Sequence, residues 1–152
     1  MSISRRSFFG IASLPVAIAS VTSAAVATDS EPIRQPATAD AARFMARAVE
    51  MRQRAVDTGD QAFGAVVVRD GRIVGQAPSR VIVNRDPTAH AEMEAIRDAA
   101  RRLETNDLSN CVIYSTSRPC RMCETAGYWA SLARSYSGEA ITDNGRPLYS
   151  SC

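Results

Sequence analysis

Two short groups of metal-binding residue types, 30 residues apart, constrain this 152-residue chain more than any other feature. The only histidine, His90, is followed by Glu92, and Cys120 and Cys123 form a C-x-x-C pair directly after a proline. One histidine and two cysteines can hold one zinc ion only if the fold brings both groups to the same point. Apolar spacing predicts a helix beginning at each place, so two helix N-termini should face the same ion.

Hydrophobic periodicity divides the chain from residue 38 onward into helices and strands. Two β-branched runs flank Asp70-Gly71, a common two-residue turn, and predict an initial hairpin. Helices that alternate with strands after a hairpin predict an α/β domain, in which helices cover both faces of a sheet. We predict helices over residues 38–56, 89–103 and 121–131, strands over residues 64–69, 72–76, 111–116 and 133–137, and a short edge strand at Leu148-Tyr149.

The first 27 residues show the order of residue types that is typical of a secretory signal. Arg5 and Arg6 precede an uncharged stretch over residues 8–27, which ends in the small-residue sequence Ala25-Val26-Ala27. The arginine pair, followed by Phe8, resembles the twin-arginine signal, which directs folded proteins out of the bacterial cytoplasm. A general secretory signal and an uncleaved membrane anchor are the alternatives.

This segment sets the predicted organisation of the chain. We predict a twin-arginine-type signal peptide over residues 1–27, a linker over residues 28–37 and a zinc-binding domain over residues 38–152. The twin-arginine export machinery would then deliver the protein to the periplasm. Of 18 basic residues, all arginines, cleavage after Ala27 removes two, which leaves 16 against 16 acidic residues. A nucleic-acid-binding protein normally has a basic surplus, so no nucleic-acid partner is expected.

The two motifs together match the H-x-E … P-C-x-x-C signature of zinc deaminases. Three protein ligands leave the fourth zinc position to water, and zinc lowers the pKa of that water far enough to supply hydroxide near neutral pH. Glu92 can take the water's proton, give it to a ring nitrogen and later protonate the leaving amine. A closed structural zinc site with Cys111 or Cys152 as fourth ligand is one alternative, and a disulfide between Cys120 and Cys123 is another.

The remaining two cysteines, Cys111 and Cys152, also have two interpretations. They could form a disulfide that ties the C-terminus to the sheet. Alternatively, Cys111 is a small buried residue on a strand and Cys152 carries a free thiol.

Four segments carry a resemblance to a known family: Phe63-Gly64-Ala65-Val66-Val67, Asp86-Pro87-Thr88-Ala89-His90-Ala91-Glu92, Pro119-Cys120-Arg121-Met122-Cys123 and Tyr128-Trp129-Ala130. They make residues 59–138 similar to the cytidine deaminase superfamily, and within it to the branch of guanine deaminases and tRNA-adenosine deaminases. The resemblance implies a three-layer α/β/α fold with a mixed central sheet, one zinc ion per chain and a homodimer. It also implies that His90, Cys120 and Cys123 bind zinc while Glu92 shuttles protons.

The same resemblance implies a set of substrate contacts. The backbone N–H of Ala91 would face the substrate, and Phe63 and Trp129 match positions that line the base pocket. The alternative role of these two side chains is in the hydrophobic core. Ser79 stands where the family has an asparagine that reads the base, and a hydroxyl offers fewer paired contacts than an amide. Asn84 lies close in sequence and is a candidate to replace that asparagine.

The chain departs from the family at three further places. Arg118 stands where the family favours glutamate, and Arg121 lies inside the cysteine motif. Each arginine faces either an anionic or carbonyl-rich ligand or solvent. The C-terminus is short, and Asp143 is the remote candidate for the later acidic residue of guanine deaminases.

We therefore expect an exported zinc-dependent aminohydrolase that deaminates a small amino-substituted heterocycle and releases ammonia. A purine base such as guanine is the first candidate for the substrate. Cytosine or another amino-heterocycle is the alternative substrate. A catalytically silent zinc-binding protein of the same fold is the alternative function, because the base-reading asparagine is replaced and the tail is short.

Overall fold

The computed structural model describes residues 31–149. The predicted signal peptide, the first part of the predicted linker and Cys152 lie outside these residues. The cleavage site and the disulfide between Cys111 and Cys152 therefore stay predictions. No helix in the described part of the chain is both long and apolar enough to span a bilayer.

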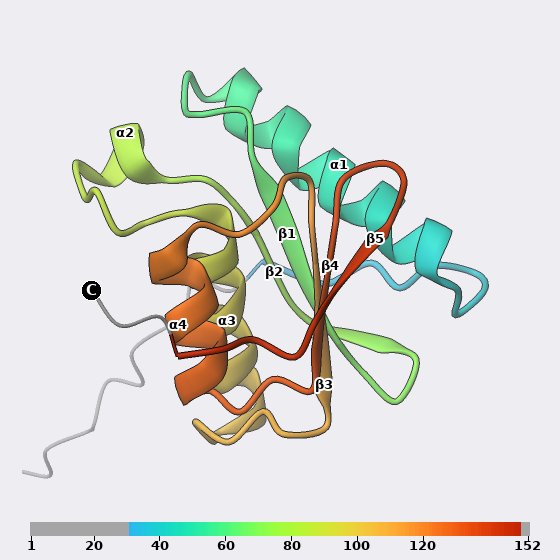
Figure 1. Ribbon diagram of the computed structural model, residues 1–152. Coiled ribbons are helices and arrows are strands. Elements are labelled where there is room, and N and C mark those ends of the chain that lie inside the picture. The colour runs from blue at the N-terminus through green and yellow to red at the C-terminus, as the bar shows by residue number, and fades with distance from the viewer. Residues whose placement is uncertain (1–30, 150–152) are drawn as a thin grey trace, which may run out of the picture.

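The described chain forms four helices and five strands, which match most of the predicted elements (Figure 1). The first helix and the hairpin are α1 (Ala41–Asp57), β1 (Gly64–Arg69) and β2 (Arg72–Pro78). Two helices of the site and the strand between them follow after one short turn of helix. These elements are α2 (Val81–Asn84), α3 (Ala91–Leu103), β3 (Cys111–Ser115) and α4 (Arg121–Trp129), and the chain ends with β4 (Arg134–Ser137) and β5 (Thr142–Gly145).

The five strands form one mixed sheet in the order β2-β1-β3-β4-β5. Strand β1 runs antiparallel to both β2 and β3, β3 is parallel to β4, and β4 is antiparallel to β5. Helix α1 covers one face of this sheet, and α3 and α4 lie on the other side (Figure 1). The predicted three-layer α/β/α architecture with a mixed sheet is thus confirmed.

The end of the chain and the segment after β2 differ from the sequence prediction. The predicted edge strand at Leu148-Tyr149 is wrong, because β5 is formed earlier, over Thr142–Gly145. Gly138 and Ile141 both have positive φ angles, which turn the chain back at once, so the residues next in line pair with the free edge of β4. Helix α2 was not predicted, since one turn of helix leaves no periodicity to detect.

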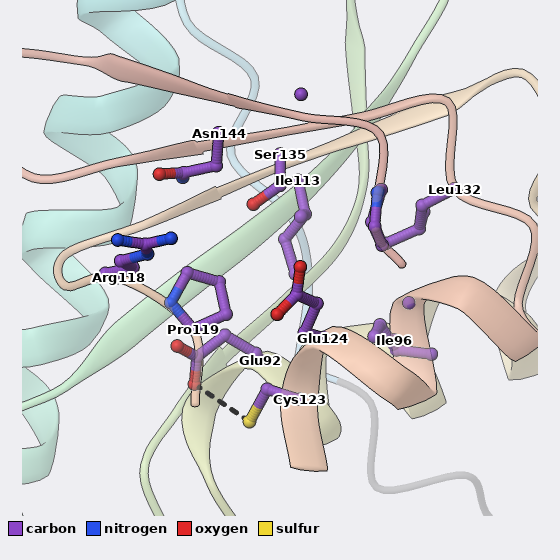
Figure 2. A pocket seen from close by; sticks show the side chains of 13 residues that line it. Glu92, Ile96, Ile113, Arg118, Pro119, Cys123, Glu124, Leu132, Ser135 and Asn144 are labelled. Carbon is purple, nitrogen blue, oxygen red and sulfur yellow. Dashed lines mark hydrogen bonds between the residues drawn. The ribbon is translucent and has the colours of Figure 1, made fainter. Parts of the chain in front are cut away.

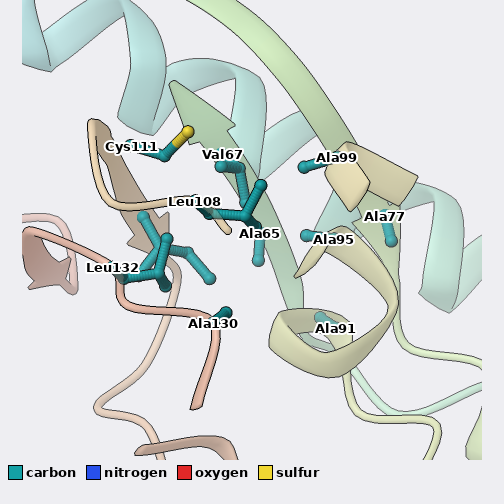
Figure 3. Packing of buried hydrophobic residues seen from close by; sticks show 11 residues of the cluster. Ala65, Val67, Ala77, Ala91, Ala95, Ala99, Leu108, Cys111, Ala130 and Leu132 are labelled. Atoms are coloured by element: carbon teal, nitrogen blue, oxygen red, sulfur yellow. The ribbon is translucent and has the colours of Figure 1, made fainter. Parts of the chain in front are cut away.

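Helix α3 packs against the sheet through a face of small residues (Figure 3). Its residues Ala91, Ala95 and Ala99 are fully buried and belong to the same core cluster as Val67 of β1. Gly75 of β2 lies under this face: a Cβ atom there would lie 2.5 Å from the carbonyl oxygen of Ala95. The short distance between α3 and β2 fixes the position of the N-terminus of α3, where His90 lies.

The free edge of β2 is covered by side chains rather than by another strand. Gln35 pairs with Ile73 as a strand would, because its Oε1 accepts from the Ile73 N–H at 2.8 Å and its Nε2 donates to the Ile73 carbonyl at 2.7 Å. Farther along, Asp98 of α3 accepts a hydrogen bond from the backbone N–H of Gln76. The residues from 31 to 37 contain no helix or strand, as expected for a linker, but Gln35 attaches this segment to the domain.

Substituting Gly75 with alanine should destabilise the fold, because the new methyl group meets helix backbone that cannot move alone. We expect Gly75→Ala to lower the free energy of unfolding by about 2–3 kcal/mol, measured by urea denaturation. Gly127→Ala is the matched control, since its Cβ would lie 3.1 Å from the side chain of Pro147 and meets no backbone that closely. Equal stability of the two variants would contradict the tight contact between α3 and β2.

Candidate metal centre and active site

Each of the two helices that carry the site begins at a residue with metal-binding chemistry. His90 is the N-cap of α3 and Cys120 is the N-cap of α4, and both have extended backbone. An N-cap side chain usually accepts a hydrogen bond from its own helix, but neither of these does. Both side chains are therefore free to point to a shared position, close to two helix N-termini whose dipoles favour thiolates.

The loop before α3 is held in place by its own hydrogen bonds. The Asp86 carboxylate accepts from both the N–H and the hydroxyl of Thr88 at 2.8 Å. The Arg80 N–H then donates to the carbonyl of Ala89, directly before His90, at 2.9 Å. This short, tied loop orients His90 before the helix begins.

The two motifs come together as predicted. His90, Cys120 and Cys123 offer ligand atoms that all lie within 4.8 Å of one another. The two sulfur atoms are 3.7 Å apart, and the His90 Nδ1 atom lies 3.7 Å from Cys120 Sγ and 3.6 Å from Cys123 Sγ. Among the described residues, no other histidine, cysteine or acidic side chain joins these three as a fourth ligand. Cys111 is therefore not a ligand of this site.

These distances fit a tetrahedral zinc ion. With Zn–S bonds of about 2.3 Å and Zn–N bonds of about 2.0–2.1 Å, tetrahedral angles separate two sulfurs by about 3.8 Å and sulfur from nitrogen by about 3.6 Å. The distances between the three ligand atoms agree with these values to within about 0.2 Å. The cysteines are spaced for a zinc ion and are too far apart for a disulfide bond, whose S–S length is about 2.05 Å.

Glu92 lies beside this group without joining it. Its side chain lies in the first turn of α3, is 5% exposed, and places Oε2 3.6 Å from Cys123 Sγ (Figure 2). Burial raises the pKa of the Glu92 carboxyl and also raises the pKa of the Cys123 thiol. Two neighbouring buried groups that both carry negative charge are stabilised by a nearby cation. The donor set therefore supports zinc on chemical grounds as well as on distance.

Ser79, the predicted substitute for the base-reading asparagine, is engaged inside the protein. It is 1% exposed, and its hydroxyl donates to Asp60 Oδ1 at 2.8 Å. Asp60 Oδ2 accepts the backbone N–H groups of Ile82 and Val83, the first turn of α2. Although burial alone would raise it, the pKa of Asp60 is held below its usual value by these hydrogen bonds. Ser79 thereby supports α2, and its contact with a substrate stays a prediction.

Asp60 is the residue of this region that sequence reasoning missed. The side chain is 8% exposed and accepts four hydrogen bonds, of which two come from α2, one from Ser79 and one from the Gln61 N–H in its own loop. An acidic residue just before a buried strand was the available signal, but its partners come from a segment about 20 residues later in the chain. Asn84, the other candidate for base reading, is exposed at the end of α2.

The aromatic candidates are both at the surface. Phe63 is 41% exposed and Trp129 is 70% exposed, so the alternative that they are core aromatics is wrong. Trp129 makes edge-on contacts with Tyr128 and Tyr149, with ring centroids 5.5 and 6.0 Å away. Ala91 is the first residue of α3, where a backbone N–H has no partner within the helix. The substrate contacts of Phe63, Ala91 and Trp129 remain predictions that this exposure permits.

The predicted charged candidates have different surroundings. Arg118 and Arg121 are exposed on either side of Cys120, and neither forms an ion pair among residues 31–149. Asp143, the remote acidic candidate, forms an ion pair with Arg134 across the β4–β5 hairpin. This ion pair links the two strands of the hairpin and occupies the carboxylate of Asp143.

One histidine and two cysteines at converging helix N-termini, with a buried glutamate beside them, make up the residue pattern of the zinc-binding site in zinc deaminases. The model of the cytidine and deoxycytidylate deaminase zinc-binding region matches residues 38–139, and the chain belongs to this family. It is 43% identical over 88 residues to the guanine deaminase of Bacillus subtilis (strain 168), and 43% identical over 83 residues to a tRNA-specific adenosine deaminase of Aquifex aeolicus (strain VF5).

These similarities cover part of each protein. The alignment spans 57% of this chain and 56% of the Bacillus subtilis guanine deaminase, and 55% of both partners in the second comparison. The chain therefore matches just over half the length of these relatives. The crystal structure of Bacillus subtilis guanine deaminase superposes with a TM-score of 0.63 at 37% identity, over 66% of this chain and 68% of that chain.

Removing a zinc ligand should abolish metal binding, whereas removing the other described cysteine should not. We expect Cys120→Ser and Cys123→Ser to lower zinc content from one ion per chain to below about 0.1, measured by atomic emission after dialysis. Cys111→Ser is the matched control, because Cys111 is buried on β3 outside the group of three. Loss of zinc from Cys111→Ser would point to a closed structural site.

Proposed function

We propose that this protein is a zinc-dependent aminohydrolase that removes an exocyclic amino group from a small amino-substituted heterocycle, releasing ammonia. The observation that carries the proposal is the buried carboxylate of Glu92 next to a group of only three protein ligands. A purely structural zinc site has four protein ligands and needs no neighbouring base. Within the described residues, this site has the ligand number of a catalytic centre.

The residues of the site have separate roles in the proposed reaction. His90, Cys120 and Cys123 would hold zinc, which when bound acts as a Lewis acid toward water and substrate. Glu92 receives a proton from the attacking water, delivers it to a ring nitrogen and finally protonates the departing amine. Burial raises the pKa of the Glu92 carboxyl, which makes it a stronger base toward the proton of the attacking water. The N–H of Ala91 offers a donor to the substrate at the N-terminus of α3.

A purine base such as guanine is the substrate class we favour. Support comes from the similarity to a guanine deaminase, and from exposed aromatic side chains at Phe63 and Trp129, on which a flat base could stack. Cytosine or another amino-heterocycle is the alternative substrate. The Ser79 hydroxyl donates its hydrogen bond to Asp60, so other groups have to recognise the base. The similarity to tRNA-specific adenosine deaminases favours an adenosine in RNA as a second candidate.

Location and assembly belong to the same proposal. The twin arginines at positions 5 and 6 and the apolar stretch that follows support export of the folded enzyme to the periplasm. Export in the folded state would let zinc protect Cys120 and Cys123 before they meet oxidants.

A homodimer is supported by the exposed aromatic cluster of Tyr128, Trp129 and Tyr149, since such surfaces often bind another chain.

Activity and its dependence on Glu92 can be measured together. We expect the zinc-loaded protein to release ammonia from one member of a panel of guanine, adenine, cytosine, their nucleosides, amino-triazines and an RNA anticodon hairpin. Glu92→Ala should keep one zinc per chain and lower kcat by about 10²–10⁴-fold, because the proton carrier is lost. Glu94→Ala is the matched control on the same helix, as Glu94 forms an ion pair with Arg97.

Two outcomes would count against this assignment. Normal turnover by Glu92→Ala would remove Glu92 from the mechanism. Silence of the zinc-loaded protein across the whole panel would favour the alternative of a catalytically silent zinc-binding protein.

Export is tested by changing the arginine pair alone. Replacing Arg5 and Arg6 together with lysine should leave the precursor in the cytoplasm, because the twin-arginine machinery reads arginine at these positions. Replacing Arg101 and Arg102 with lysine keeps the same charges outside the signal and serves as the control. Fractionation and immunoblotting measure the result, and mature protein in the periplasm after the first change would contradict twin-arginine export.

A further inference from the structure

A small cavity lies behind Glu92, between α4 and the sheet (Figure 2). Its volume is about 30 Å³, and Ile96, Ile113 and Leu132 form its apolar walls. Because a water molecule needs about 10–15 Å³ measured in this way, the cavity has room for two or three molecules of that size. Glu92 and Cys123 line one end, so the cavity adjoins the metal centre.

One polar group in this cavity has no partner. Ser135 of β4 is 5% exposed and lines the cavity, and its Oγ is the one buried side-chain oxygen or nitrogen in the described chain without a hydrogen-bond partner. A buried hydroxyl left in this state is costly, and native proteins nearly always supply a partner. The hydroxyl therefore indicates a small hydrogen-bonding molecule in the cavity.

The other polar groups around the cavity include both acceptors and donors. Glu124 of α4 lines it and forms no ion pair among residues 31–149, and Asn144 of β5 bonds to Ser137. The lining holds two carboxyl groups, those of Glu92 and Glu124, and one guanidinium, that of the exposed Arg118. The carboxyl oxygens and the Ser135 hydroxyl can accept hydrogen bonds, so the lining suits a small guest with N–H donors.

We propose that this cavity receives the ammonia released by the reaction, as ammonia or as ammonium. The inference rests on the proposed function. In hydrolytic deamination the C–O bond to water forms and the exocyclic C–N bond breaks. One proton of the water ends on the ring nitrogen of the product and the other on the departing ammonia. Glu92 delivers that second proton, and the cavity begins at Glu92, so the leaving group has a space with hydrogen-bond acceptors beside it.

The test uses ammonium chloride as the ligand and compares it with sodium chloride at equal ionic strength and neutral pH. We expect ammonium to raise the Tm of the zinc-loaded wild-type protein saturably and to inhibit turnover. Ser135→Ala should weaken both effects about three- to tenfold, as expected for one lost hydrogen bond. Ser115→Ala should leave both unchanged, because this buried hydroxyl already donates to the Ser117 carbonyl.

A crystal soaked in rubidium chloride provides a direct view, since rubidium replaces ammonium and scatters anomalously. We expect a peak in contact with Ser135 Oγ in the wild type and none there in Ser135→Ala. An unchanged Tm with ammonium, or equal responses of wild type and Ser135→Ala, would show that the cavity holds water only and would overturn the proposal. Saturable ammonium binding without turnover of any substrate would sink the proposed function and leave the site standing.

Discussion

The structure depends on the convergence of two helix N-termini on one point. Both α3 and α4 begin at an N-cap whose side chain makes no capping bond and is directed instead to the shared position. Such a start gives up part of the stability that capping usually supplies. A metal ion held between His90, Cys120 and Cys123 would compensate for this lost stability, because the ion joins the two helices to each other. We therefore expect folding and metal binding to be coupled at this point.

The sheet places these two helices through close backbone contacts. Gly75 lets α3 approach β2, and Gly64 lets α1 approach β1 from the other face, where a Cβ would lie 2.2 Å from the Ala48 carbonyl oxygen. Helix α4 is different, since it contacts α3 and leaves a cavity between itself and the strands. The rigid part of the site is thus the α3 side with His90 and Glu92, and the open space lies on the α4 side.

The sequence predicted the ligand set better than the substrate contacts, for a physical reason. His90, Glu92, Cys120 and Cys123 lie at short, fixed spacings within two helix starts, so local rules already restrict where they point. Ser79 is different because its partner, Asp60, comes from another segment, and no local pattern announces that hydrogen bond. The same holds for Trp129, whose exposure depends on what packs beyond the end of α4.

The sequence alone determined the order of the three longer helices and of β1 to β4, the hairpin at Asp70-Gly71 and the identity of the metal-binding group, because periodicity and spacing are local properties. Only the tertiary structure decided that Thr142–Gly145 forms β5 on the free edge of β4, because this segment has no apolar residue and so no strand pattern of its own. It also decided that Ser135 is buried without a partner. Such facts depend on which segments meet in space, and the amino-acid pattern of one segment does not contain them.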